Sequence, residues 1–62
     1  MTWPRSEYEP GQRVLHPTER DWGVGQVQSV VGERVTVNFE HRGKVLINVA
    51  AVPLTIVEGD EA

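Results

Sequence analysis

Few side chains in this sequence are of the types that do chemistry. His16 and His41 are its only histidines, and it contains no cysteine. A metal site needs three or more ligands at suitable spacing, and nothing in the sequence organises such a set around either histidine. No serine has a candidate base at hand, and Gly23-x-Gly25 lacks the helix that follows a nucleotide-binding loop. The sequence therefore predicts a protein that is not an enzyme and has no metal or other cofactor.

Trp22 is the strongest candidate for a residue that contacts a partner. It stands in a polar loop immediately before Gly23-x-Gly25. Tryptophan is over-represented among residues that dominate binding energy at protein interfaces. The same ring could instead cap the open end of a small core, and one half-buried ring can do both. His16 precedes Pro17 and is expected to hold this loop through a hydrogen bond to the backbone.

A series of polar residues continues from the strand predicted at residues 34–40 into the turn that follows it. Its members are Asn38, Glu40, Arg42 and Lys44. Such a series either meets a partner or is a solvated hairpin whose cross-strand pairs contribute ~0.2–1 kcal/mol each. Together with Trp22 and His16 it completes the set of candidate partner-binding residues, which are Trp22, His16, Asn38, Glu40, Arg42 and Lys44.

Short strands must position these side chains. The clearest one covers residues 34–40, where Val35, Val37 and Phe39 alternate with polar residues at the period of a half-buried strand. Further strands are expected at residues 12–16, 23–31, 44–49 and 54–57, separated by proline and glycine turn signals. Periodicity does not say which of Val45, Leu46 and Ile47 faces the core.

The predicted fold is all-β: a small five-stranded antiparallel SH3-like (Tudor-like) barrel. A single 3₁₀ turn is expected within residues 48–52, immediately before the last strand, because Pro53 stops that segment. The barrel occupies residues 11–57. Residues 1–10 are expected to be an irregular arm whose Trp3 and Tyr8 can fold back onto the domain, and residues 58–62 to be an acidic, disordered tail.

Composition narrows the function classes. Six basic residues stand against nine acidic ones, a net charge of -3, which disfavours nucleic acid as the partner. There is no apolar run of the length that a signal peptide or a membrane span requires. The expectation is a cytoplasmic protein that does not engage a membrane.

Glycine, aromatic and valine positions carry a family resemblance over roughly residues 10–57. The pattern comprises Gly11-x-x-Val14-x-His16-Pro17, Trp22-Gly23-x-Gly25-x-Val27, Val35-x-Val37-x-Phe39, Gly43-Lys44 and Leu54. It resembles a family of short bacterial proteins classed as a domain of unknown function. More distantly it is similar to the C-terminal Tudor-like domain of UvrD/PcrA helicases and to the RNA-polymerase-interacting module of CarD and the transcription-repair coupling factor.

The resemblance implies a non-enzymatic protein-interaction module that docks on RNA polymerase or on DNA-repair and transcription machinery. Two alternatives remain. One is a weak nucleic-acid-binding barrel, which the charge disfavours. The other is a homodimer through an edge strand, motivated by the arrangement in which Leu46 faces the core and leaves Val45 and Ile47 uncovered.

Overall fold

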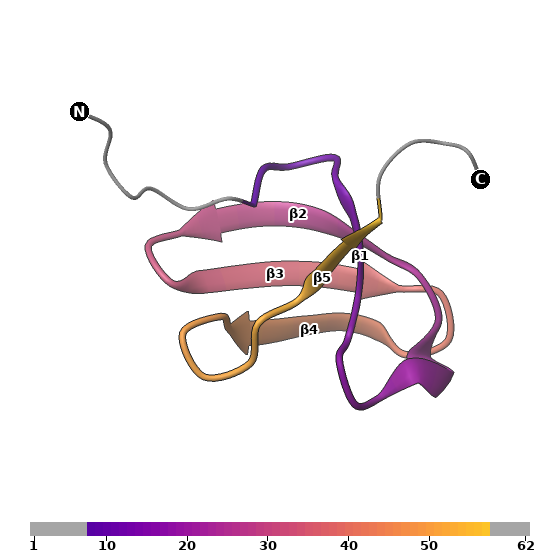
Figure 1. Cartoon of the computed structure of the whole chain (residues 1–62). Coiled ribbons are helices and arrows are strands. Elements are labelled where there is room, and N and C mark those ends of the chain that lie inside the picture. The colour runs from indigo at the N-terminus through magenta and orange to yellow at the C-terminus, as the bar shows by residue number, and fades with distance from the viewer. Residues whose placement is uncertain (1–7, 58–62) are drawn as a thin grey trace.

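The computed structural model describes residues 8–57, which form five strands and one short 3₁₀ helix (Figure 1). The expected arm at residues 1–7, with Trp3, and the expected tail at residues 58–62 lie outside the described residues. Each strand lies within two residues of its expected bounds. In chain order the elements are β1 (Arg13–Leu15), η1 (Arg20–Trp22), β2 (Gly25–Val31), β3 (Arg34–Phe39), β4 (Gly43–Asn48) and β5 (Thr55–Val57).

All five strands belong to one antiparallel sheet with the order β4-β3-β2-β1-β5. Strands β2, β3 and β4 form a meander. Strand β1 lies between β2 and β5, and its residues Arg13 and Val14 pair with both. Figure 1 shows β1 and β5 running across the layer of β2, β3 and β4. The all-β, five-stranded prediction is confirmed; the sheet is strongly curved but not closed, and β4 and β5 are its two edges.

The core lies on the concave side of this sheet. Strand β3 supplies its centre, since alternate residues are buried and exposed along it as predicted. Leu54, just before β5, closes the core from the crossing layer. The buried residues are Val14, Val27, Val35, Val37, Phe39, Ile47 and Leu54.

The structure shows which residues of 45–47, in β4, point toward the core. Ile47 is buried and Val45 packs against the core, whereas Leu46 is 62% exposed. The register gives the reason, because Ile47 pairs with buried Val35 and Val45 with buried Val37. The arrangement that motivated a homodimer, with Leu46 inside, is therefore not the one that the chain adopts.

The expected position of the 3₁₀ turn was wrong. The 3₁₀ helix is η1, between β1 and β2, where Trp22 N–H donates to the Glu19 carbonyl and Gly23 N–H to that of Arg20. Residues 49–52 form a different turn around Asn48. The Asn48 carbonyl accepts from the N–H groups of both Ala51 and Val52, and its side-chain Oδ1 accepts from Ala50 N–H.

The two glycines after Trp22 serve different purposes, although both fall within the strand expected at residues 23–31. Gly25 is in β2, and a methyl group there would overlap Val37 and lie 2.6 Å from Phe39 Cδ1. Gly23 precedes the strand with φ +80°, and a side chain there would lie 2.8 Å from His41 Cδ2. Gly25 thus permits close packing of β2 on β3, and Gly23 permits a backbone conformation that L-residues rarely adopt.

Tyr8 does fold back onto the domain. Its hydroxyl lies 3.2 Å from both the carbonyl oxygen and the amide nitrogen of Leu54, and its ring packs against the core. The last residues of the expected arm are therefore part of the folded unit.

Candidate functional site

The loop after β1 is organised by His16. Its Nδ1 accepts hydrogen bonds from the backbone N–H groups of Thr18, at 3.1 Å, and Glu19, at 2.9 Å. A backbone N–H can only donate, so Nδ1 carries no proton in this arrangement. The structure confirms the expected bond from His16 to the loop backbone. By turning the chain at Thr18 and Glu19, His16 sets the start of η1.

Trp22 stands at the end of η1 and is half-buried over one end of the core. Its ring makes edge contacts with Phe39, at 5.2 Å between centroids, and with His16, at 4.8 Å. Offset and edge-to-face geometries of this kind are the favoured ones for aromatic rings. Trp22 therefore caps the core, one of the two roles expected for it.

Arg42 covers part of the ring that the core leaves open. Its Cζ lies 5.2 Å from the centroid of the Trp22 ring, within the range of a cation–π contact. The turn that carries Arg42 is tied to η1 by a hydrogen bond of 2.9 Å from His41 N–H to the Trp22 carbonyl. We call the group of His16, Trp22, Phe39 and Arg42 the aromatic end.

The expected polar series does not form one surface. Arg42 turns toward Trp22, whereas Asn38 and Lys44 pair across β3 and β4 on the convex side of the sheet. Glu40 lies between these regions and has its Oε1 3.8 Å from Nε2 of His41, with both side chains largely exposed. Such an exposed pair contributes little to stability. Three of the six candidate residues, namely His16, Trp22 and Arg42, thus meet at one site.

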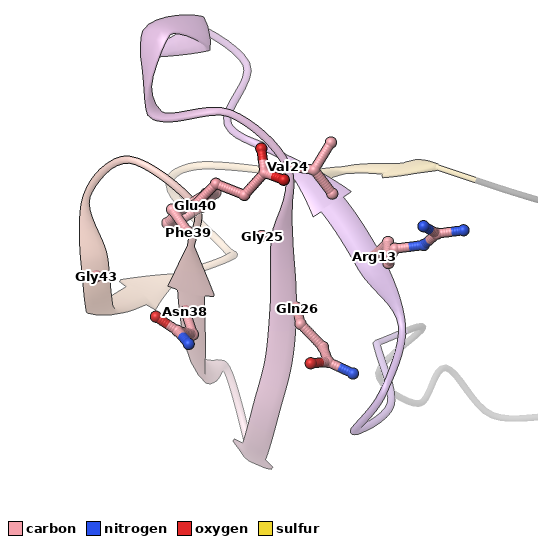
Figure 2. Close-up of a pocket in the computed structure, with 8 residues that line it drawn as sticks. All are labelled: Arg13, Val24, Gly25, Gln26, Asn38, Phe39, Glu40 and Gly43. Atoms are coloured by element: carbon pink, nitrogen blue, oxygen red, sulfur yellow. The ribbon is translucent and has the colours of Figure 1, made fainter. Parts of the chain in front are cut away.

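An open groove crosses the sheet beside the aromatic end and encloses about 570 Å³. Figure 2 shows its lining side chains on neighbouring strands. Arg13 and Gln26 contribute to it and were not among the predicted candidates. The register could have revealed them, since Arg13 pairs with Gln26, and Gln26 with Asn38. The full lining is Arg13, Val24, Gly25, Gln26, Asn38, Phe39, Glu40 and Gly43.

Residues 8–57 contain neither a cluster of metal ligands nor a membrane-spanning helix. Within residues 8–57, no three histidine, aspartate or glutamate side chains converge as metal ligands would. No helix in that range has the length and apolar character needed to cross a membrane. The arrangement offers contact surfaces: an aromatic ring flanked by a cation, and a groove lined by carboxamides and charges.

Fold and site together define a small all-β protein with an aromatic cluster at one end of a single curved sheet. Residues 8–57 match the family described as Protein of unknown function (DUF3553), and the chain belongs to that family. No curated protein and no solved structure matches the chain.

Proposed function

We propose that this protein is a non-enzymatic protein-interaction module that docks on its partner through the aromatic end. The observation that carries the proposal is the half-buried Trp22 ring with Arg42 over it at 5.2 Å. Tryptophan and arginine are among the residue types most enriched at interface hot spots. Here the core fixes the Trp22 ring before binding, so little side-chain entropy is lost when a partner covers it.

The fold proposed for the whole chain is an open SH3-like, Tudor-like barrel. The strand order supports it, because a meander of β2, β3 and β4 is followed by a β5 that returns to β1. The edge strand β4 begins at Gly43, directly after Arg42, and pairs only with β3 among the described strands. In strand addition, an extended segment of a partner pairs with an exposed sheet edge. A partner strand that paired with β4 in this way would start beside the aromatic end.

The resemblance to helicase and coupling-factor modules supports a partner in bacterial transcription or DNA repair, with RNA polymerase as the first to test. We propose no catalytic activity for the protein, and we propose that it acts in the cytoplasm. A homodimer through an edge strand has less support, because Ile47 belongs to the core and Val45 packs against it, so neither needs a partner to cover it.

Photo-crosslinking in the native cell tests the proposal with any partner protein, whatever its identity. A photoreactive phenylalanine analogue replaces Asp21, exposed in η1 next to Trp22, in one variant and Ala51, exposed in the turn before β5, in a matched control. We expect a discrete protein adduct from position 21 and none from position 51. The Trp22→Ala substitution, introduced beside the probe at 21, should abolish that adduct. No adduct at 21, or equal adducts at both positions, would overturn the proposal.

A further inference from the structure

The convex side of the sheet presents a second surface, distinct from the aromatic end. Its side chains form three cross-strand rows, fixed by the register of β1 to β4. We call this the outer face. The rows are Arg13, Gln26, Asn38 and Lys44; then Ser29, Thr36 and Leu46; then Val31, Arg34 and Asn48, with Gln28 in the bulge between the first two.

The charged residues in the strands of the outer face are all basic, while Glu40, just after β3, adds one carboxylate at the groove. Arg13, Arg34 and Lys44 lie on the outer face, and no acidic residue of the described chain lies in any strand. The net charge of -3 therefore comes from acidic residues in the loops, the turns and the terminal segments. A solvated protein surface normally mixes both signs, so the segregation itself points to an anionic partner.

Two cations of the outer face are available to a ligand. Among the described residues, neither Arg34 nor Lys44 has a carboxylate within ion-pair distance. Two large apolar side chains share the face, Val31 at 69% and Leu46 at 62% exposed. Leu46 stands two residues from Lys44 on the same face of β4, so an apolar contact and a cation are offered side by side.

The groove gives this face a place for a chain to lie. The paired residues Gly25, Phe39 and Gly43 form a rung whose backbone is the groove floor, because their side chains are absent or directed to the core. The side chains of Arg13, Gln26 and Asn38 form one wall, as Figure 2 shows across three neighbouring strands. Val24 and Glu40 form the other.

We propose that the outer face binds single-stranded nucleic acid, a function beyond the protein contact assigned to the aromatic end. Arg34 and Lys44 neutralise backbone phosphates. The carboxamides of Gln26 and Asn38 each offer a donor and an acceptor, which is the pairing that exposed base edges require. Gln28 and Asn48 offer less, because Gln28 Nε2 donates to the Gln26 carbonyl and Asn48 Oδ1 accepts from Ala50 N–H.

An acidic protein is the other anionic partner that this charge would attract, and the composition of the face argues against it. Protein interfaces concentrate binding energy in buried aromatic anchors, and the outer face has no aromatic side chain among the described residues. Carboxamides and hydroxyls make up most of it instead. Without stacking rings, its binding is weak and dominated by phosphate contacts, and therefore strongly salt-dependent.

Fluorescence anisotropy with a labelled 12-nucleotide oligo(dT) tests the proposal on the full chain. At low salt we expect saturable binding whose log–log dependence on salt has a slope of about -1.4, from about 0.7 for each of the two phosphate contacts of Arg34 and Lys44. Arg34→Gln and Lys44→Gln should each weaken binding about threefold and flatten the slope by about 0.7. Glu40→Gln removes the one carboxylate of the groove and should tighten binding about twofold.

Arg20→Gln is the matched control, since it removes one exposed positive charge from η1, away from the outer face. It should change the affinity by less than about 1.5-fold, the size expected of a distant, screened charge. Circular dichroism confirms that each variant is folded. The proposal fails if oligo(dT) does not bind at low salt, or if Arg20→Gln weakens binding as much as Lys44→Gln does. It also fails if a labelled oligoglutamate binds more tightly than oligo(dT), a result that would assign the face to an acidic protein.

Discussion

The aromatic end and the outer face are built by different means, although they share the rung at Phe39. The aromatic end is assembled from loops: η1 brings Trp22, the loop after β1 brings His16, and the β3–β4 turn brings Arg42. The outer face is made by strand alternation alone, because burying every second residue of β3 exposes the others.

This difference separates stability from binding in the two regions. The aromatic end rests on the core, so its substitutions change both the free energy of unfolding and any contact with a partner. The outer face makes no contribution to the core, so its charges can be altered with little structural effect. A chain of only 62 residues thereby holds two surfaces with independent chemistry.

Replacing Ile47 or Leu46 by alanine should give the largest contrast between the two sides of the sheet. Ile47→Ala removes a buried side chain and should lower the free energy of unfolding by about 2–5 kcal/mol, close to the whole stability of a domain this small. Leu46→Ala, one residue away, should change it by less than about 0.5 kcal/mol. Urea unfolding measures both, and the reverse order would mean that β4 is shifted by one residue.

Trp22→Ala should have the next largest effect. The ring is half-buried, so we expect a loss of about 2 kcal/mol, below the 3–5 kcal/mol that is typical of a fully buried ring. Trp22→Phe retains the contact with Phe39 and should recover most of that loss. Thermal unfolding compares the two variants. An unchanged melting temperature for Trp22→Ala would show that the ring does not cap the core.

His16→Ala should cost about 1 kcal/mol of stability, because it frees the N–H groups of Thr18 and Glu19 from their acceptor. His16→Asn is the informative control, since an asparagine Oδ1 accepts from the same backbone positions in Asx turns. His16→Asn should restore the stability that comes from the hydrogen bonds, but not the part that comes from the ring contact with Trp22. If both variants unfold at the same urea concentration, the hydrogen bonds to Nδ1 contribute nothing.

Arg42→Ala should have the smallest effect on stability. An exposed cation–π contact contributes about 0.5–1 kcal/mol, so the urea midpoint should fall only slightly. Fluorescence in a Trp3→Phe background reports on the Trp22 ring alone, and its quenching by acrylamide should increase when the guanidinium no longer covers the ring. Lys44→Ala, the control on the outer face, should leave quenching unchanged.

The fold could be predicted from the sequence more fully than the site. The alternation of apolar and polar residues at 34–40 and the glycine and proline turn signals identified all five strands, since both signals are local. The 3₁₀ helix was misplaced because its start depends on the hydrogen bonds of Thr18 and Glu19 to His16. Pro53, on which the expected position was based, gives no information about these hydrogen bonds.

The site was predicted in part for a related reason. Trp22, His16 and Arg42 were singled out by residue type and do meet. Arg13 and Gln26 were missed because their position beside Asn38 follows from strand register, which no single segment reveals. The net charge of the whole chain also hid the basic character of the outer face, because the acidic residues lie outside the strands.

The separation of the two surfaces is best tested by an NMR titration with the 12-nucleotide oligo(dT) at low salt. We expect progressive shifts of backbone amides along the outer face, at Gln26, Asn38 and Lys44, with the indole N–H of Trp22 unmoved. Shifts centred on the Trp22 indole with the strand amides unmoved would contradict that separation, as would a spectrum that does not change at all.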